Sequence, residues 1–265
     1  MPGVTVTIIT LNESANIAAA IESVRWADEI VVVDAESTDD TVAIARRYTD
    51  RVIVRPWAGF IEQKNFAASQ AAHDWILSLD ADERVTPALA DEIRALLAAG
   101  PLCAGYRMPR VSHYLGRWFR STDWYPDHQV RLYDRRRAAW AGRYVHESIR
   151  AEGEIGRLRA ELQHYPYRDV SHHLQTIDRY SGLAARQMFE DGRRTGALRI
   201  LLHGNAAFLR NYLVRGGFRD GAAGLVVSML NTIYVVLKFV KLWETCSRCT
   251  STPPAPGAGD RTRSS

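Results

Sequence analysis

Three acidic side chains follow a short apolar run in the segment WILSLDADERV, residues 75–85. Asp80, Asp82 and Glu83 stand so close together that their carboxylates repel one another unless a cation lies among them. An isolated Asp-x-Asp pair is usually a solvated turn or a helix cap, but the apolar residues before this pair predict a buried strand that ends at the carboxylates. Mg²⁺ and Mn²⁺ prefer oxygen ligands and also bind phosphates, so the pattern predicts a divalent metal ion that holds a substrate diphosphate.

Strands and helices alternate along the first hundred residues. Residues 4–10 are β-branched almost throughout, which predicts a buried strand, and residues 14–26 repeat apolar side chains at helical spacing. Such an alternation predicts a parallel sheet with helices on both faces. The further expected strands are residues 29–34, 51–55 and 75–79, and the further expected helices are residues 40–48, 60–73 and 87–98.

Polar side chains follow three of these strands at their carboxyl ends. They occur in TLNE, residues 10–13, in DAES, residues 34–37, and in DAD, residues 80–82. Ligands bind at the carboxyl ends of parallel strands, so we expect the three clusters to share one edge of the sheet. The segment TLNESANI lacks the glycines of a nicotinamide-binding fingerprint, which disfavours a nicotinamide-dependent enzyme.

The two parts of the chain differ in charge and in composition. Residues 1–100 carry 8 Lys and Arg against 16 Asp and Glu, and residues 101–265 carry 26 against 14. The basic part is rich in Arg and aromatic side chains, and it predicts short strands at residues 105–110 and 129–134 joined by irregular loops. Such a basic surface fits an anionic membrane, a phosphorylated glycolipid or a nucleic acid. Because the sequence has no recognisable nucleic-acid motif, we expect no nucleic-acid partner.

The C-terminal part is helical and apolar. A long helix is expected at residues 171–191, followed by apolar stretches at residues 197–214 and 222–243. The last stretch has about sixteen residues before Lys238, fewer than the roughly 20 that a spanning helix needs. We therefore expect helices that lie in a membrane interface, with a buried helical hairpin and a true membrane span as the alternatives.

Cysteine usage and the chain ends favour the cytosol. Cys103, Cys246 and Cys249 give no even disulfide framework, which favours a reducing compartment. Cys246 and Cys249 would need two further ligands to bind zinc, and they open a segment, residues 246–265, whose Ser, Thr, Pro and Gly content predicts disorder. The N-terminus MPGVTVTIIT lacks a basic region followed by a long apolar run, so we expect no signal peptide.

Six segments in this order resemble family 2 inverting glycosyltransferases of the GT-A fold. They are TLNE, VVVDAESTDDT, GFIEQKNFA, WILSLDADERV, PDHQVRLY and GRYVHE, within about residues 4–170. HYPYRDVSHHLQTIDRYSGLAAR and KFVKLWE extend the resemblance to the bacterial lipopolysaccharide inner-core β-glucosyltransferase subgroup. The resemblance implies an α/β GT-A fold, the Rossmann-like fold of nucleotide-diphospho-sugar transferases, with a mixed sheet. It also implies a catalytic domain at residues 1–170, divided into a nucleotide-sugar half (1–100) and an acceptor half (101–170), and a helical membrane-association region at residues 171–245.

The resemblance places the first two polar clusters at the nucleoside of a UDP-sugar. Thr10, Asn12 and Glu13 would contact the nucleoside, and Asp34 would lie at the uracil edge. An ionised carboxylate accepts a hydrogen bond from an imide N–H, so Asp34 could distinguish uracil from cytosine. The alternative for Asp34 is a cap on the turn that follows it.

The third cluster is placed at the sugar-diphosphate. Asp80 and Ala81 would lie beside the ribose, and Asp82 would hold Mg²⁺ or Mn²⁺. Lys64 matches the position of a basic residue near the diphosphate, and an exposed helix lysine is the alternative.

Two acidic residues are candidates for the catalytic base. Asp127 aligns with the family's base, although Pro126 replaces the acidic residue that usually precedes it. A salt bridge with Arg131 is the alternative role for Asp127. His146 could complete the metal shell, and Glu147 could orient the acceptor or act as the base.

The sequence therefore favours an enzyme that moves glucose from UDP-glucose to a heptose hydroxyl of the lipopolysaccharide core. Its acceptor would be a lipid-anchored core oligosaccharide, and the protein would lie on the cytoplasmic, anionic face of the inner membrane. One alternative keeps the fold with a polyprenyl-phosphate acceptor or another UDP-sugar. A second alternative is a non-enzymatic, Arg-rich module that binds membranes or anions.

Overall fold

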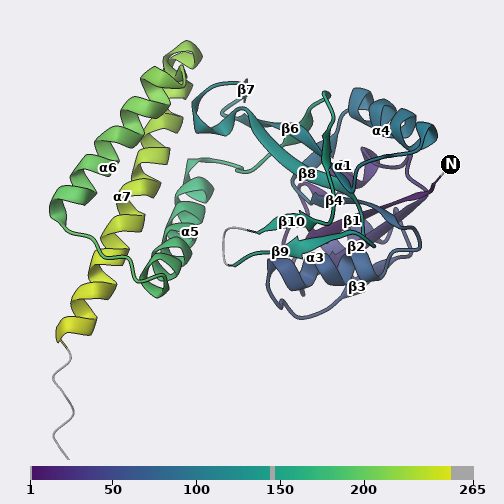
Figure 1. Cartoon of the computed structure of the whole chain (residues 1–265), viewed down its shortest axis with the longest axis horizontal. Helices are drawn as coiled ribbons and strands as arrows, with labels where there is room; N and C mark the ends of the chain where they lie inside the picture. The colour runs from purple at the N-terminus through teal and green to yellow at the C-terminus, as the bar shows by residue number, and fades with distance from the viewer. Residues whose placement is uncertain (1, 144–146, 252–265) are drawn as a thin grey trace, which may run out of the picture.

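A mixed 10-stranded sheet is the centre of the N-terminal domain (Figure 1). The computed structural model describes residues 2–143 and 147–251. Helices cover both faces of the sheet, which confirms the expected α/β architecture. Along the sheet the strands have the order β3 (Val52–Val54), β2 (Glu29–Asp34), β1 (Val4–Thr10), β4 (Trp75–Asp80), β8 (Asp127–Asp134), β6 (Gly105–Tyr114), β12 (Leu162–His164) and β5 (Glu83–Val85).

Strands β3, β2, β1 and β4 form the parallel part of the sheet. β1 lies between β2 and β4, with Thr10 opposite Asp34 and Ile9 opposite Asp80. All of β1 is buried, because its β-branched side chains pack against helices on both faces. The register brings the carboxyl ends of β1, β2 and β4 to one edge of the sheet, as the sequence predicts.

The helices of this domain divide between the two faces. α1 (Ile17–Glu22), α2 (Thr41–Ala45) and α4 (Pro87–Ala99) pack on one face, and α3 (Phe60–Ser69) packs on the other. The first two helices are shorter than expected. The backbone N–H of Glu13 donates to Thr41 Oγ1 at 2.8 Å, which fixes the turn before α1 to the start of α2.

The remaining strands form the second part of the domain, in which antiparallel and parallel pairs are mixed. β8 runs antiparallel to both β4 and β6, and β6 is longer than expected because it also pairs with β7 (Arg117–Phe119). β12 is parallel to β6 and antiparallel to β5. The smaller strands are β9 (Ala138–Ala141), which pairs with β10 (Ser148–Ala151), and β11 (Ile155–Arg157), which pairs with β6.

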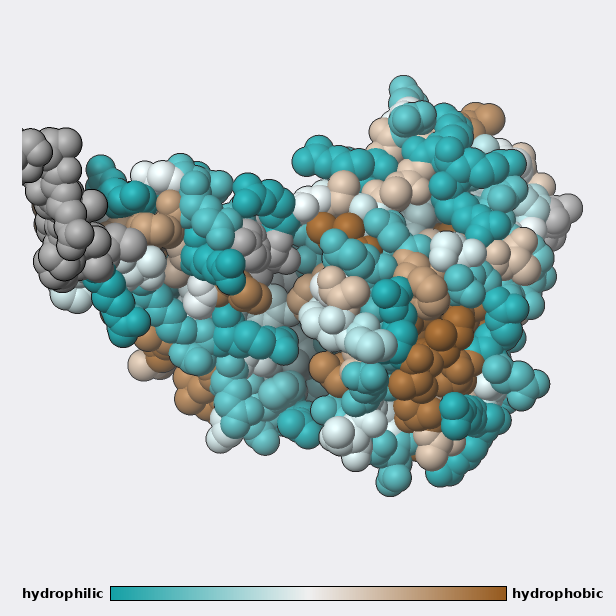
Figure 2. All heavy atoms as spheres, turned by 90° about the horizontal axis from the view of Figure 1, so that it is seen from below, coloured by the Kyte–Doolittle hydropathy of each residue, from teal (hydrophilic) through white to brown (hydrophobic). Residues whose placement is uncertain are grey.

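Three helices form a separate lobe, α5 (Val170–Glu190), α6 (Ala197–Leu209) and α7 (Gly221–Ser251). Figure 2 shows this lobe and the sheet-containing lobe joined by a narrower waist. α7 packs against both α5 and α6, and a Cβ added to Gly204 of α6 would lie 2.7 Å from Val236, so glycine permits the close approach. α7 extends to Ser251, so the first residues of the segment expected to be disordered are helical instead.

By length and composition, α7 is apolar enough to cross a membrane. Within Gly217–Arg248, an 18-residue window has a mean hydropathy of 1.8, and 22% of that window is buried inside the protein. The interfacial arrangement expected from the sequence therefore remains a prediction, with a membrane span as its alternative. A fully buried hairpin does not fit, because α6 and α7 leave many of their leucines exposed.

Candidate active site

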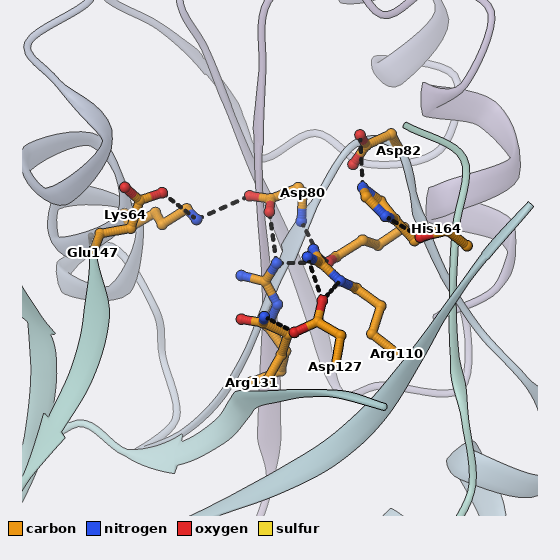
Figure 3. A network of polar contacts seen from close by, with 11 residues as sticks. Lys64, Asp80, Asp82, Arg110, Asp127, Arg131, Glu147 and His164 are labelled. Carbon is orange, nitrogen blue, oxygen red and sulfur yellow. Dashed lines mark hydrogen bonds and ion pairs between the residues drawn. The ribbon is translucent and has the colours of Figure 1, made fainter. Parts of the chain in front are cut away.

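Asp80, at the end of β4, lies between two cations (Figure 3). Its carboxylate is 3.1 Å from Lys64 Nζ and accepts a hydrogen bond from Arg131 Nη2 at 2.6 Å. Burial alone would raise the pKa of Asp80, but the positive charges of Arg131 and Lys64 outweigh it and hold this pKa well below its usual range. Asp80 is therefore ionised at neutral pH.

Glu83 is the fully buried member of the acidic cluster. Its carboxylate accepts hydrogen bonds from Arg110 Nη1 at 2.8 Å, from Arg131 Nη2 at 2.6 Å and from the backbone N–H of Asp80 at 3.1 Å. The two arginines thus relieve the repulsion between Asp80 and Glu83 that the sequence assigned to a metal ion alone. Sequence reasoning missed Arg110 and considered Arg131 only as a partner of Asp127, because both arginines come from β6 and β8, far along the chain from Asp80 and Glu83.

Asp127 begins β8 and shares Arg110 with Glu83. It accepts hydrogen bonds from Arg110 Nε at 2.9 Å and from the Gln129 side chain at 2.6 Å. Burial raises the pKa of Asp127, but Arg110 and Gln129 lower it further than burial raises it. The salt bridge considered for Asp127 exists, but its partner is Arg110 and not Arg131.

Asp82 lies apart from Asp80, with its carboxylate beside His164 of β12 (Figure 3). The Asp82 carboxylate is 3.3 Å from His164 Nε2, and His164 Nδ1 lies 3.0 Å from Ser112 Oγ. Asp80 and Asp82 therefore have different partners. The expected metal ligand His146 lies outside the described residues, and within those residues no three His, Cys, Asp or Glu side chains gather as a metal site.

A local excess of negative charge surrounds Asp82. Burial raises the pKa of Glu13, and the nearby Asp82 carboxylate raises it further. One carboxylate oxygen and one imidazole nitrogen, beside a second, half-buried acid, suit a divalent cation whose other ligands are phosphate oxygens and water. The residues present therefore fit Mg²⁺ or Mn²⁺.

The residues at the ends of β1 and β2 form a connected polar edge. Asp34 is fully buried and accepts hydrogen bonds from the backbone N–H and the hydroxyl of Ser37 at 2.8 and 2.5 Å, which is the turn cap considered for it. Asn12 has φ of 56° and accepts a hydrogen bond from the Thr38 N–H at 2.8 Å. Thr10 Oγ1 is buried without a hydrogen-bond partner among the described residues, so it can serve a ligand.

Lys64 of α3 reaches into this site instead of solvent. Lys64 is 2% exposed, and its Nζ lies 4.1 Å from the centre of the Trp140 ring and 3.7 Å from the Glu147 carboxylate. Asn65 fixes α3 to β9 through two hydrogen bonds with the Trp140 backbone. The exposed-lysine alternative is wrong.

Comparison with known proteins decides the family. The family model for glycosyl transferase family 2 matches residues 5–159. The chain belongs to glycosyl transferase family 2. This glycosyltransferase is 33% identical over 248 residues to the lipopolysaccharide core biosynthesis glycosyltransferase LpsC of Rhizobium meliloti (strain 1021), across 89% of this chain and 90% of LpsC. It is also 33% identical over 250 residues to an uncharacterized glycosyltransferase of Rickettsia typhi, across 89% of this chain and 85% of that one.

A solved structure shares the fold of the glycosyltransferase. The mannosyltransferase PcManGT from Pyrobaculum calidifontis, in complex with GDP-Man and Mn²⁺, has a TM-score of 0.53 and 17% identity, across 92% of this chain and 88% of that one. Family membership disfavours a non-enzymatic module.

The family match ends at residue 159, so His164 and helices α5 to α7 lie beyond it.

Proposed function

We propose that the enzyme moves glucose from UDP-glucose to a heptose hydroxyl of the lipopolysaccharide inner core, with inversion at the anomeric carbon. The acceptor class is supported by the similarity to LpsC, which covers 89% of this chain and 90% of LpsC. The reaction type is supported by one observation above all. Arg110 joins Asp127, a base on the acceptor side, to the acidic cluster that ends β4 and begins β5.

The donor would bind along the ends of β1, β2 and β4. Asp34 has lone pairs left beside its two bonds from Ser37 and would accept the uracil imide N–H. Thr10, Asn12 and Glu13 would contact the nucleoside. Lys64 would stay charged beside the diphosphate, because Asp80 and Glu147 flank it.

Asp82 and His164 would hold Mg²⁺ or Mn²⁺. The buried residue Ala81 lies between Asp80 and Asp82 in the chain, and it would set the distance between Asp82 at the ion and Asp80 at the ribose. When bound, the ion neutralises the charge that develops on the departing diphosphate. The hydrogen bond between Ser112 and His164 Nδ1 would orient the ring so that Nε2 faces the ion.

Asp127 would remove the proton from the acceptor hydroxyl. At the same time the hydroxyl oxygen would bond to the anomeric carbon of the donor sugar, and the bond between that carbon and UDP would break. Its lowered pKa keeps the carboxylate ionised, so it can accept this proton at neutral pH. Glu147 would hold Lys64 in place, because the two lie 3.7 Å apart. This assignment gives the role of base to Asp127 and not to Glu147.

Transfer assays would test the proposal directly. The full chain is incubated with a panel of UDP-sugars and truncated core acceptors, with Mn²⁺ or with a chelator, and products are read by mass. We expect a product heavier by one hexose from UDP-glucose, formed only with the ion. No product with any UDP-sugar from a folded protein would refute the proposed reaction.

Two variants separate the base from its neighbours. Asp127→Asn should lower transfer to a hydroxyl by about a thousandfold or more, whereas Glu147→Gln should retain most of it. A phosphate acceptor is already deprotonated, so Asp127→Asn would spare transfer to a polyprenyl phosphate. Near-normal transfer by Asp127→Asn to the core acceptor would show that the assigned base is wrong.

A further inference from the structure

The helical lobe carries two cavities that the proposed reaction does not use. The first is an apolar groove of about 660 Å³ between the helices, lined by side chains that include Leu201, Phe208, Met229 and Ile233. The second, the arginine pocket, has about 280 Å³ and is lined by Met188, Arg193, Arg194, Arg199, His203 and Phe239.

The apolar groove belongs to a wide exposed apolar surface. Exposed fractions between 49% and 68% are found for Leu198, Leu201, Leu202 and Leu209 of α6 and for Met229 and Trp243 of α7. Contiguous apolar surface of this kind is unfavourable in water and marks a place where another molecule binds. The groove runs between two helices, so it suits a long, narrow apolar group.

Backbone oxygens hold two of the three arginines of the arginine pocket in place. Arg194 Nη1 donates to the carbonyls of Phe189 at 3.4 Å and Arg193 at 2.9 Å, and Arg199 Nη1 donates to the carbonyl of Arg194 at 3.1 Å. Within the part of the chain that the structure describes, Arg193, Arg194 and Arg199 form no ion pair with a carboxylate. A guanidinium has five N–H donors, so each side chain keeps donors for a ligand.

The two cavities are close to each other. His203 lines the arginine pocket and the next residue, Gly204, lines the apolar groove, so they are separated by no more than the width of one helix, about 10 Å. Their ligand must therefore combine an anionic group with an apolar chain. Arginine forks match phosphate oxygens in particular.

We propose that the arginine pocket binds the phosphate group of an anionic membrane lipid, and that the apolar groove takes an acyl chain beside it. The positive charge of the arginine pocket complements the negative charge of the phosphate. In the apolar groove, an acyl chain would cover apolar side chains that are otherwise exposed to water. A water-soluble phosphate would leave the groove empty. The site would fix one face of the helical lobe to the membrane, independently of which sugar the active site transfers.

Vesicle binding by the full chain tests this inference. Co-sedimentation is measured with vesicles of phosphatidylcholine alone and of phosphatidylcholine with phosphatidylglycerol. The wild type should bind the anionic vesicles much more tightly. Arg194→Gln/Arg199→Gln should lower that affinity by about tenfold or more. The matched control Arg46→Gln/Arg47→Gln, which removes the same charge from an exposed part of the sheet-containing lobe, should change it less than about twofold.

Three results would overturn the inference. Equal losses in the two double variants would mean that only overall charge matters. Displacement from vesicles by millimolar inorganic phosphate would show that the pocket takes free phosphate. Sedimentation as a stable dimer that ignores vesicles would assign the apolar surface to a second copy of the chain. Melting temperature and donor hydrolysis confirm that each variant folds, and the single variant Arg193→Gln repeats the test if the double variant does not fold.

Discussion

Arg110 links the buried part of the active site to its catalytic edge. One guanidinium serves Glu83 through Nη1 and Asp127 through Nε and Nη2. Because arginine stays charged at any physiological pH, it keeps Asp127 ionised, but it also weakens Asp127 as a base. As the proposed base, Asp127 would have to give up part of this bond to accept a proton from the sugar hydroxyl, so Arg110 would set both the charge and the strength of that base.

Replacing Arg110 by Gln should move the acid limb of the pH–rate profile to higher pH. Without the guanidinium, burial would dominate and raise the pKa of Asp127. Asp127 would then be protonated over a wider acidic range, and kcat/KM should fall about tenfold more at about pH 5 than at about pH 8. Rates of transfer to a soluble acceptor across this range measure the shift.

Arg107 provides the matched control, because it lies on the same strand with its side chain exposed. Arg107→Gln should keep the wild-type profile. Arg110→Lys restores the positive charge but not the several N–H donors of a guanidinium. It should move the acid limb part of the way back to its wild-type position. An unshifted limb in Arg110→Gln would mean that Arg110 does not set the pKa of Asp127.

His164→Ala should weaken the binding of Mn²⁺ in the presence of UDP. His164 is the imidazole that faces Asp82, and Ser112 orients it. Ser112→Ala, which leaves the ring in place, should cost about tenfold in affinity, as for other partners of a metal ligand. Isothermal titration of Mn²⁺ into the protein with UDP measures both changes without turnover. Wild-type affinity in His164→Ala would make His146 the candidate instead.

The sequence predicts the acids of the site but not their partners. Asp80 and Asp82 are recognisable because they follow an apolar strand and match a family segment, whereas Asp127 is recognisable through the resemblance alone. Arg110, Arg131 and His164 have no such local signal, since only the pairing of distant strands brings them to the acids. Lys64 was predicted, but its burial beside Trp140 depends on how α3 packs on β9.

At the scale of elements, the short strand β12 decides what faces Asp82. It places His164 opposite both Glu83 of β5 and Ser112 of β6. A strand of three residues is too short for an alternation of apolar and polar side chains to show it, so the sequence could not predict it. The longer elements, such as β1, β4 and α5, were predicted because their periodic patterns are long.

An aromatic cluster joins α5 to the catalytic domain. His173 of α5 stacks on Tyr167 with ring centres 3.7 Å apart, and it also contacts Tyr114 and Trp124. His173 is buried, and burial lowers its pKa from 6.5 to about 4. The folded protein thus keeps this ring neutral where the unfolded chain binds a proton.

Acidification should therefore destabilise this junction. Because the folded pKa is depressed, the stability it contributes is complete above pH 6.5 and is lost as the pH falls towards 4. The expected loss is about 2 kcal/mol at about pH 5. Thermal unfolding of the wild type and of His173→Phe, at about pH 7.5 and about pH 5, measures it. The difference between the two pH values should be smaller in the variant, and an equal difference would rule out His173 as the cause.

At the scale of the whole molecule, charge and apolar surface separate along the chain. Residues 1–100, the proposed donor side, have more acids than bases, whereas residues 101–265 have more bases than acids. The helical lobe adds exposed leucines to this positive charge. An anionic membrane would attract the helical lobe and repel the donor side, so the active site would stay open to the cytosolic nucleotide sugar.

The apolar surface should matter only when the acceptor is held in a membrane. Leu201→Gln/Leu209→Gln removes two exposed apolar side chains of α6, 63% and 51% exposed, whose burial in lipid would be worth about 1.5–3 kcal/mol each if complete. Transfer to a lipid-anchored acceptor in vesicles should fall by about tenfold or more. Partial burial of the two leucines in lipid already supplies about 1.4 kcal/mol, which corresponds to a tenfold change in membrane affinity. Transfer to the same core oligosaccharide freed of its lipid should not change.

Leu102 supplies the control for this experiment, because it is 90% exposed in the sheet-containing lobe. Leu102→Gln should leave both transfers as in the wild type. If Leu201→Gln/Leu209→Gln slows both acceptors equally, the leucines act through the fold and not through the membrane. If it slows neither, the helical lobe binds lipid through another surface. Only loss confined to the anchored acceptor fits a lobe that places the enzyme at its substrate while the chemistry stays with Asp127 and its neighbours.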